Sequence, residues 1–129
     1  MGYTHYWDTN SKITDEQWEK SCNFVNKAIK TTSAEIVGGH AEVGTDPEVS
    51  VNRVVFNGVE DDGHETFHIP RNNGEWEFCK TARKPYDDLV IACLLAAMSI
   101  GVIGGWSSDG EKDEHQQGYD LYKKVSNAL

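Results

Sequence analysis

The segment Pro85–Gly101, PYDDLVIACLLAAMSIG, decides the fold of this chain. Its central part, Leu89–Met98, is apolar on every side, which is typical of a helix buried inside a domain. Pro85 fits the first turn of such a helix, and Asp87 and Asp88 lie near its positive end, where acidic side chains are stabilising. The segment therefore predicts a buried helix that ends at its final glycine.

A second helix is predicted earlier in the chain, over about residues 15–31. Thr14 can serve as its N-cap, and Gln17, three residues later, completes a capping box. Ile13 and Trp18 make the matching hydrophobic staple. Apolar side chains then recur at helical spacing and predict one buried stripe, formed by Trp18, Cys22, Val25 and Ile29.

Other segments favour strands. The opening, Gly2–Trp7, is aromatic and alternating. Between Glu35 and Lys80, short apolar runs alternate with turn residues, which indicates three or four antiparallel strands. Residues 51–56 end at the hairpin dipeptide Asn57-Gly58, residues 64–69 end at Pro70, and residues 76–79 follow the turn Asn73-Gly74.

A last helix is expected near the end of the chain. Ser108 with Glu111 offers a capping box to open it, and its apolar stripe is His115, Gly118, Tyr122 and Val125. These elements predict an α+β fold, in which a mostly antiparallel sheet of four to five strands is packed by two to three helices. No repeat or proline-rich linker divides the chain, so we expect residues 1–129 to form a single domain.

The composition restricts the partners. The chain has 129 residues, 38% of them hydrophobic, and 12 basic against 21 acidic side chains give a formal charge of −9. A net negative surface repels nucleic acids and anionic membranes, so neither is expected as the main partner. Leu89–Met98 is too short for the roughly 20 residues that span a bilayer. The lack of a signal-like N-terminus and of paired cysteines predicts a cytoplasmic protein with reduced thiols.

The segment His64–His68 matches the zinc-protease pattern H-E-x-x-H. That chemistry needs both histidines on one face of a helix, but the flanking Gly63 and Pro70 and the β-prone residues between them predict a strand. Residues four apart on a strand lie about 13 Å apart, too far for one ion. We therefore expect no metal site; instead, His64, Thr66 and His68 would share a strand face that could line a pocket.

Lys80, Arg83 and Lys84 form a cationic island in an acidic protein. The island lies between the end of a predicted strand and the start of the buried helix, whose free amides and dipole favour anions. Arg83 can bind a phosphate or carboxylate with two parallel hydrogen bonds, and the lysines add charge. The alternative is a set of surface cations paired with nearby acids such as Glu77.

The aromatic opening has two interpretations as well. If it is a strand, Tyr3, His5 and Trp7 share one face, and Thr4 and Tyr6 share the other. One face must pack on the helices, while the other could offer a flat surface on which a ring stacks.

Five blocks of this sequence resemble an uncharacterised family of small proteins encoded by bacteriophages and prophages. The blocks are Gly2–Trp7, Phe56–Gly58, Asp62–Phe67, Phe78–Asp87 and Ser108–Gly110. The resemblance implies a phage origin and a setting in the bacterial cytoplasm, and it implies no particular reaction.

We therefore expect a binding protein without turnover, which sequesters a phosphate-bearing, nucleotide-like ligand and needs no cofactor. Such a protein could act as a counter-defence sponge in a phage. Lys80, Arg83 and Lys84 would neutralise phosphate, and His5 or Trp7 would stack on a base. Directional hydrogen bonds would come from the remaining candidate residues: Asn57, His64, Thr66, Tyr86 and Asp109.

Two other functions stay open. The first is a small hydrolase or phosphodiesterase that uses His5, His64 or His68 as acid–base groups, assisted by Glu65. The second is an acidic inhibitor of a host enzyme, for which the short carboxylate pairs Asp61-Asp62 and Asp113-Glu114 are the only local signal. A homo-oligomer also stays open, because proteins of this size often assemble symmetrically.

Overall fold

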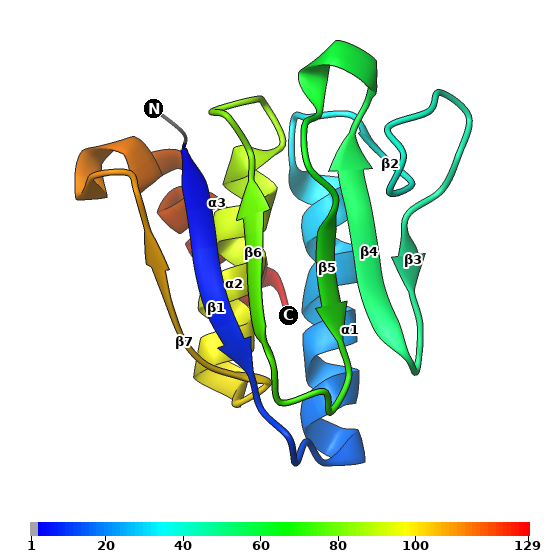
Figure 1. Cartoon of the computed structure of the whole chain (residues 1–129), viewed down its shortest axis with the longest axis vertical. Helices are drawn as coiled ribbons and strands as arrows, with labels where there is room; N and C mark the ends of the chain where they lie inside the picture. Colours follow the sequence, from blue (N-terminus) through cyan, green and yellow to red (C-terminus); the bar gives the residue numbers. More distant parts are fainter. Residues whose placement is uncertain (1–2) are drawn as a thin grey trace.

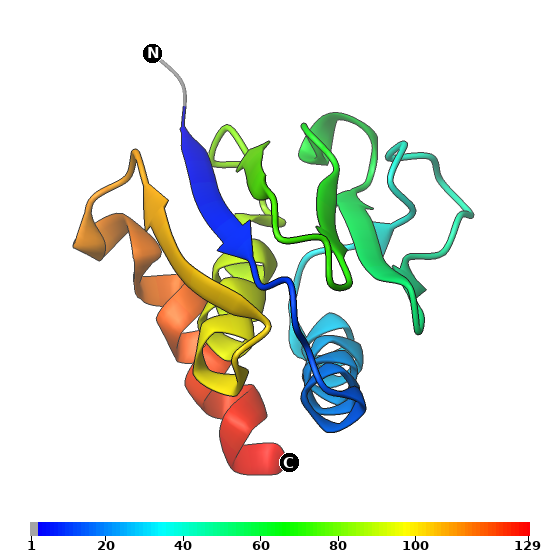
Figure 2. The ribbon, with the colours of Figure 1, turned by 60° about the horizontal axis from the view of Figure 1, so that its bottom comes forward.

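The computed structural model describes residues 3–129, which fold into a layer of strands with helices on one of its faces (Figures 1 and 2). The helices are α1 (Asp15–Thr31), α2 (Asp87–Ile100) and α3 (Gln116–Ala128). Seven strands are present in the described chain: β1 (Thr4–Thr9), β2 (Ile36–Val37), β3 (Glu48–Val49), β4 (Arg53–Gly58), β5 (Phe67–Pro70), β6 (Trp76–Lys80) and β7 (Ile103–Ser108). The α+β class is confirmed, with more strands than the sequence predicts.

The strands form two antiparallel sheets. One has the order β6-β1-β7, and in the other β4 pairs with β2, β3 and β5. A link between the two runs through Glu65, whose amide donates to the carbonyl of Lys80 (3.2 Å) and whose carboxylate accepts from the amide of Lys80 (2.7 Å). The hydroxyl of Tyr86 donates to the carbonyl of Glu65 at 2.6 Å. The loop before β5 is thereby attached to the end of β6 and to the start of α2.

The central strand β1 separates the core from the uncovered face of its sheet. Tyr3, His5 and Trp7 point toward the helices and are buried, as their alternation predicts. Trp7 packs on Phe67 with ring centroids 5.2 Å apart, so side chains of both sheets meet in one core. The strand interpretation of the opening is confirmed for Thr4–Thr9; Met1 and Gly2 lie outside the described residues.

Helices α1 and α2 are confirmed, but α2 begins at Asp87, so Pro85 precedes the helix and does not lie in its first turn as predicted. Thr14 and Gln17 form the capping box of α1, and Ile13 and Trp18 are both buried beside it. Helix α2 is buried over Asp87–Ala97 except for the half-buried Asp88, and it ends at Gly101, whose φ of 104° is the left-handed conformation that favours glycine. No helix among residues 3–129 is long and apolar enough to cross a membrane.

Three local predictions need correction. His64 to Thr66 form a loop and not a strand, because Gly58 and Gly63 approach too closely for a side chain and the short 3-10 helix η1 (Glu60–Asp62) lies between them. Asn57-Gly58 therefore ends β4 without making a two-residue hairpin. The capping box near the last helix joins Glu111 and Glu114, not Ser108 and Glu111.

Strand β7 is absent from the sequence prediction. It begins two residues after Gly101 and pairs with β1 from His5↔Ser108 to Thr9↔Ile103. After β7, the 3-10 helix η2 (Lys112–His115) leads into α3. The start of β1 and the ends of β6 and β7 thus lie near the start of α2 and near η2, at the top of the layer in Figure 1.

Candidate functional site

The segment that joins β6 to α2 is a strained turn. Ala82 and Arg83 have φ values of 52° and 58°, and the amide of Lys84 donates to the carbonyl of Thr81 at 3.0 Å. Two consecutive left-handed residues with this hydrogen bond are the pattern of a type I′ turn, where glycine or asparagine is usual. Backbone strain of this kind is concentrated at functional sites.

The turn places Arg83 against Tyr3 and Glu114. The guanidinium carbon of Arg83 lies 4.4 Å from the centroid of the Tyr3 ring. Its Nε donates to Oε2 of Glu114 at 2.6 Å, and Oε1 of Glu114 accepts from the amide of Glu111 at 3.1 Å. The hydrogen bond from Arg83, followed by that from Glu111, lowers the pKa of Glu114. Glu114 therefore holds the guanidinium by one edge.

The other edge of Arg83 is available. Its two Nη atoms have no hydrogen-bond partner among residues 3–129, and the side chain is 59% exposed. These are the two donors with which arginine binds phosphate or carboxylate in parallel. The arginine is thus oriented by the protein and keeps its bidentate edge for something else.

A hollow of about 320 Å³ opens beside this arginine. Its lining has more acids than bases: Tyr3, Arg83, Lys84, Pro85, Asp87, Asp88, Asp113, Glu114 and Gln117. Burial, and after it the charge of Asp87, raises the pKa of Asp88. The hollow therefore combines a cationic edge with a wall of hydrogen-bond acceptors.

Behind the hollow, Asp87 is buried in a network of donors. Oδ1 of Asp87 accepts from the hydroxyl of Thr81 at 2.6 Å and lies 2.6 Å from Nε2 of His5. Because a carboxylate only accepts, the His5 ring donates there. Oδ2 accepts from the Tyr3 hydroxyl at 3.3 Å. Burial, and then the Asp87 charge, raises the pKa of Tyr3, so its hydroxyl stays protonated.

A second histidine completes this buried cluster. The ring centroids of His5 and His115 are 5.8 Å apart, and both rings contact Trp106. Nε2 of His115 lies 3.1 Å from the hydroxyl of Ser108. Burial, followed by the charge of His5, lowers the pKa of His115. Both histidines are buried, and neither lines the hollow.

Of the ten residues proposed from the sequence, Arg83 and Lys84 line this hollow. His5 and Trp7 are buried in the core and present no ring face at the surface. Tyr86 is buried too, with its hydroxyl on the carbonyl of Glu65. Lys80 lies at the end of β6, outside the lining.

Asn57, His64 and Thr66 lie in a different part of the molecule, at the end of β4 and in its connection to β5. The Asn57 amide nitrogen donates to the carbonyls of Gly39 and His64 (both 3.1 Å), and its oxygen accepts from the amides of Gly58 and His64. Asn57 therefore shapes this loop from within. Thr66 donates to the same Gly39 carbonyl at 2.6 Å, and His64 is exposed.

Asp109 holds the turn after β7 against β1. Its Oδ2 accepts from the amide of Thr4 at 3.2 Å, and both of its oxygens accept from the Tyr6 hydroxyl. It lies on the opposite side of β1 from the hollow, because Tyr6 alternates with the inward-pointing His5 and Trp7.

Seven residues that line this hollow are not among the ten candidates from the sequence: Tyr3, Pro85, Asp87, Asp88, Asp113, Glu114 and Gln117. Asp88 was expected only to complement the helix dipole, and Asp113-Glu114 only to be a surface charge pair. The signal that could have found Glu114 is its place three residues after Glu111, since that spacing fixes a carboxylate at a helix start.

The motif His64–His68 has no helical geometry, because His64 and Glu65 precede β5 in a loop. Among residues 3–129, no three histidine, cysteine or acidic side chains are gathered in a way that could hold a metal ion. Cys79 is buried, and burial raises the pKa of its thiol to about 12, so this thiol is not activated.

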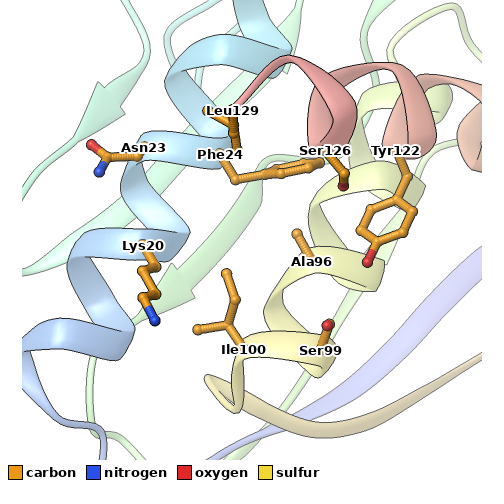
Figure 3. Close-up of a pocket in the computed structure, with 9 residues that line it drawn as sticks. All are labelled: Lys20, Asn23, Phe24, Ala96, Ser99, Ile100, Tyr122, Ser126 and Leu129. Carbon is orange, nitrogen blue, oxygen red and sulfur yellow. The ribbon is translucent and has the colours of Figure 1, made fainter.

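A second hollow, of about 470 Å³, lies between α1, α2 and α3 (Figure 3). Phe24, Ala96 and Ile100 give it an apolar floor, with the polar ends of Lys20 and Ser99 at its rim. None of the ten candidate residues from the sequence lines it. It therefore stands apart from the Arg83 site.

Comparison of the chain with protein-family profiles, with curated protein sequences and with solved structures finds no match in any of the three.

Proposed function

We propose that this protein binds a small phosphate-bearing ligand in the hollow beside Arg83, and that the ligand is nucleotide-like. The observation that carries the proposal is the state of Arg83: it is held by Tyr3 and Glu114 while both Nη atoms lack a protein partner. An arginine whose position is already fixed loses little conformational entropy when it binds an anion.

Two further features support a phosphate at this edge. Lys84 lines the same hollow and adds a second positive charge. The hollow also lies at the start of α2, where the helix dipole favours a negative group. Asp87 occupies the inner side of that helix start, so the phosphate would bind at the outer side, near Arg83 and Lys84.

The carboxylates of the lining restrict the rest of the ligand. Asp88 and Asp113 would repel a ligand that is anionic along its whole length, but they accept hydrogen bonds from hydroxyl and amino groups. A nucleoside with one phosphate carries both kinds of group: an anionic end, and ribose hydroxyls that carboxylates commonly bind. A single nucleotide therefore fits this lining better than a polyphosphate.

The proposal is binding without turnover. His5 and His115 are the acid–base groups nearest to the site, but both are buried behind Asp87 and Tyr3 and do not line the hollow. In this proposal, the protein sequesters its ligand in the cytoplasm of a bacterial host, as a phage counter-defence protein would. Lowering the free concentration of a signal requires only affinity.

Isothermal titration calorimetry against nucleoside monophosphates, cyclic nucleotides, sugar phosphates and inorganic phosphate tests the proposal. We expect heat of binding with at least one nucleotide, and a dissociation constant raised about tenfold or more in Arg83→Gln. Arg53→Gln is the matched control, because Arg53 is also half-exposed and also paired through Nε, to Glu48 at 3.0 Å.

Three outcomes would contradict the proposal. Equal affinity of Arg83→Gln and Arg53→Gln for the nucleotide would mean that the ligand binds elsewhere. The absence of binding heat with every compound, at high protein concentration, would overturn the proposal altogether. Chromatography of the ligand released by heating separates binding from hydrolysis: an intact nucleotide supports sequestration, and a cleaved one contradicts it.

A further inference from the structure

Three aromatic side chains form a row on the outer face of the β6-β1-β7 sheet. Tyr6 of β1 and Phe78 of β6 are cross-strand partners, and Trp76 lies two residues before Phe78. The rings of Tyr6 and Trp76 are 5.8 Å apart at an interplanar angle of 19°, and those of Trp76 and Phe78 are 5.2 Å apart. We call Tyr6, Trp76 and Phe78 the aromatic row.

The row is exposed because all three helices lie on the other side of the strand layer (Figure 2). Trp76 is 56% exposed and Phe78 is 51% exposed. Contiguous exposed aromatic side chains on a folded protein are typical of an interaction site, whereas single exposed apolar residues are ordinary. The core gains nothing from these rings, since Trp7 and Cys79 fill the inner face at neighbouring positions.

Carboxylates flank the row at both ends. Asp8 is exposed and pairs directly with Trp76 across the two strands. At the other end, the Tyr6 hydroxyl donates to Asp109 at 3.1 Å and 3.2 Å. Lys80 is the cation nearest to the row in strand register, two residues beyond Phe78 and opposite Thr4.

A shallow hollow of about 300 Å³ runs beside the row. Its lining includes Tyr6, Asp8, Trp76, Gly105 and Trp106. A Cβ added at Gly105 would meet no atom within 4 Å, so the absent side chain leaves real space there. The hollow has room for the end of one side chain, between aromatic rings and next to a carboxylate.

We propose that the aromatic row and Asp8 form a docking surface for an arginine-bearing segment of a partner protein. A guanidinium stacks on aromatic faces through cation–π attraction and pairs with carboxylates, and this surface offers both. The charge of the whole chain, −9, also attracts a basic partner and speeds its association. The surface faces away from the Arg83 hollow, so the proposal stands independently of the ligand proposed above.

The test is fluorescence anisotropy with a labelled peptide of alternating arginine and glycine, (Arg-Gly)4, against the full chain. We expect the dissociation constant to rise about tenfold in Trp76→Ala and to a smaller extent in Asp8→Asn. Val51→Ala is the matched control, because Val51 is 72% exposed and lies outside the row. Neither Trp76→Ala nor Val51→Ala changes the net charge, so attraction by charge alone acts equally in both.

Circular dichroism first establishes that each variant is folded, which the exposure of the substituted side chains favours. Equal affinity of Trp76→Ala and Val51→Ala for the peptide would overturn the proposal, since binding would then follow charge only. If sedimentation shows that the wild-type chain is a dimer and that Trp76→Ala is a monomer, the row is an interface between copies, and the proposal fails in that way.

Discussion

Nε2 of His5 donates to the Asp87 carboxylate at 2.6 Å, and both side chains are buried. This hydrogen bond joins the central strand β1 to the first residue of α2. The pair joins residues 82 positions apart in the sequence. Asp87 also supplies the negative charge that a helix start favours, and it does so from within the protein. Arg83 and Lys84 therefore lie beside a helix start whose inner side already carries the Asp87 carboxylate.

We expect His5→Ala to lower the free energy of unfolding by about 3–5 kcal/mol, because it leaves the buried Asp87 carboxylate without one of its two hydrogen-bond partners at 2.6 Å. Urea denaturation followed by circular dichroism measures the change. His64→Ala is the control: His64 is exposed and only its backbone is hydrogen-bonded, so we expect a change within about 0.5 kcal/mol. Equal stabilities of the two variants would show that the pair contributes nothing.

The helices were predictable from the sequence because their signals are local. The capping box of Thr14 and Gln17, the apolar run Leu89–Met98 and the glycine at 101 each act within a few residues. Strand β7 was not predictable in this way. It contains Gly104 and Gly105, which strands disfavour, and it forms because β1 offers it an edge to pair with.

The candidate site was predictable only in part, for a related reason. Arg83 and Lys84 could be predicted because they directly precede a recognisable helix start in the sequence. Two of their carboxylate neighbours, Asp113 and Glu114, come from η2, and Glu114 reaches Arg83 across 31 positions of the chain. The positive φ angles of Ala82 and Arg83 could not be predicted either, because alanine and arginine rarely adopt the left-handed conformation.

We expect stability to decrease as the pH falls below about 6.5, owing to His115. Burial and the neighbouring His5 lower its pKa in the folded chain, while Asp87, Glu114 and Asp113 act in the opposite direction. The unfolded chain therefore takes up the proton first, near the ordinary pKa of 6.5, and protonation favours unfolding until the lower folded pKa is passed.

The urea concentration at the midpoint of unfolding, measured at about pH 7.5 and pH 5.5, reports this effect. Both pH values lie above the ordinary pKa values of carboxylates. His115→Gln should show a smaller loss of stability between the two pH values than the wild-type chain. An identical loss in both proteins would assign the pH dependence to other groups.

We expect Ala82→Gly to stabilise the protein by about 0.5–1 kcal/mol, because a left-handed conformation is strained for alanine and costs glycine little. Differential scanning calorimetry measures the shift in Tm. In the control, Ala34→Gly, the φ is not positive, and the added freedom of the unfolded chain should lower the Tm. If both substitutions lower it equally, the turn before α2 stores no strain.

Gly110→Ala tests whether the packing of Tyr3 positions Arg83. A Cβ at Gly110 would lie 2.4 Å from Cε2 of Tyr3, and that ring is buried between the Arg83 guanidinium and the edge of His5. The ring cannot move without disturbing both neighbours, so we expect a loss of about 1–3 kcal/mol in the free energy of unfolding.

At Gly105 an added Cβ meets nothing within 4 Å, and Gly105→Ala should leave stability within about 0.5 kcal/mol of the wild type. If a nucleotide binds beside Arg83, its affinity should fall in the first variant and not in the second. A Gly110→Ala protein with unchanged stability would mean that Tyr3 has room to move, and Tyr3 would then not be what fixes the arginine.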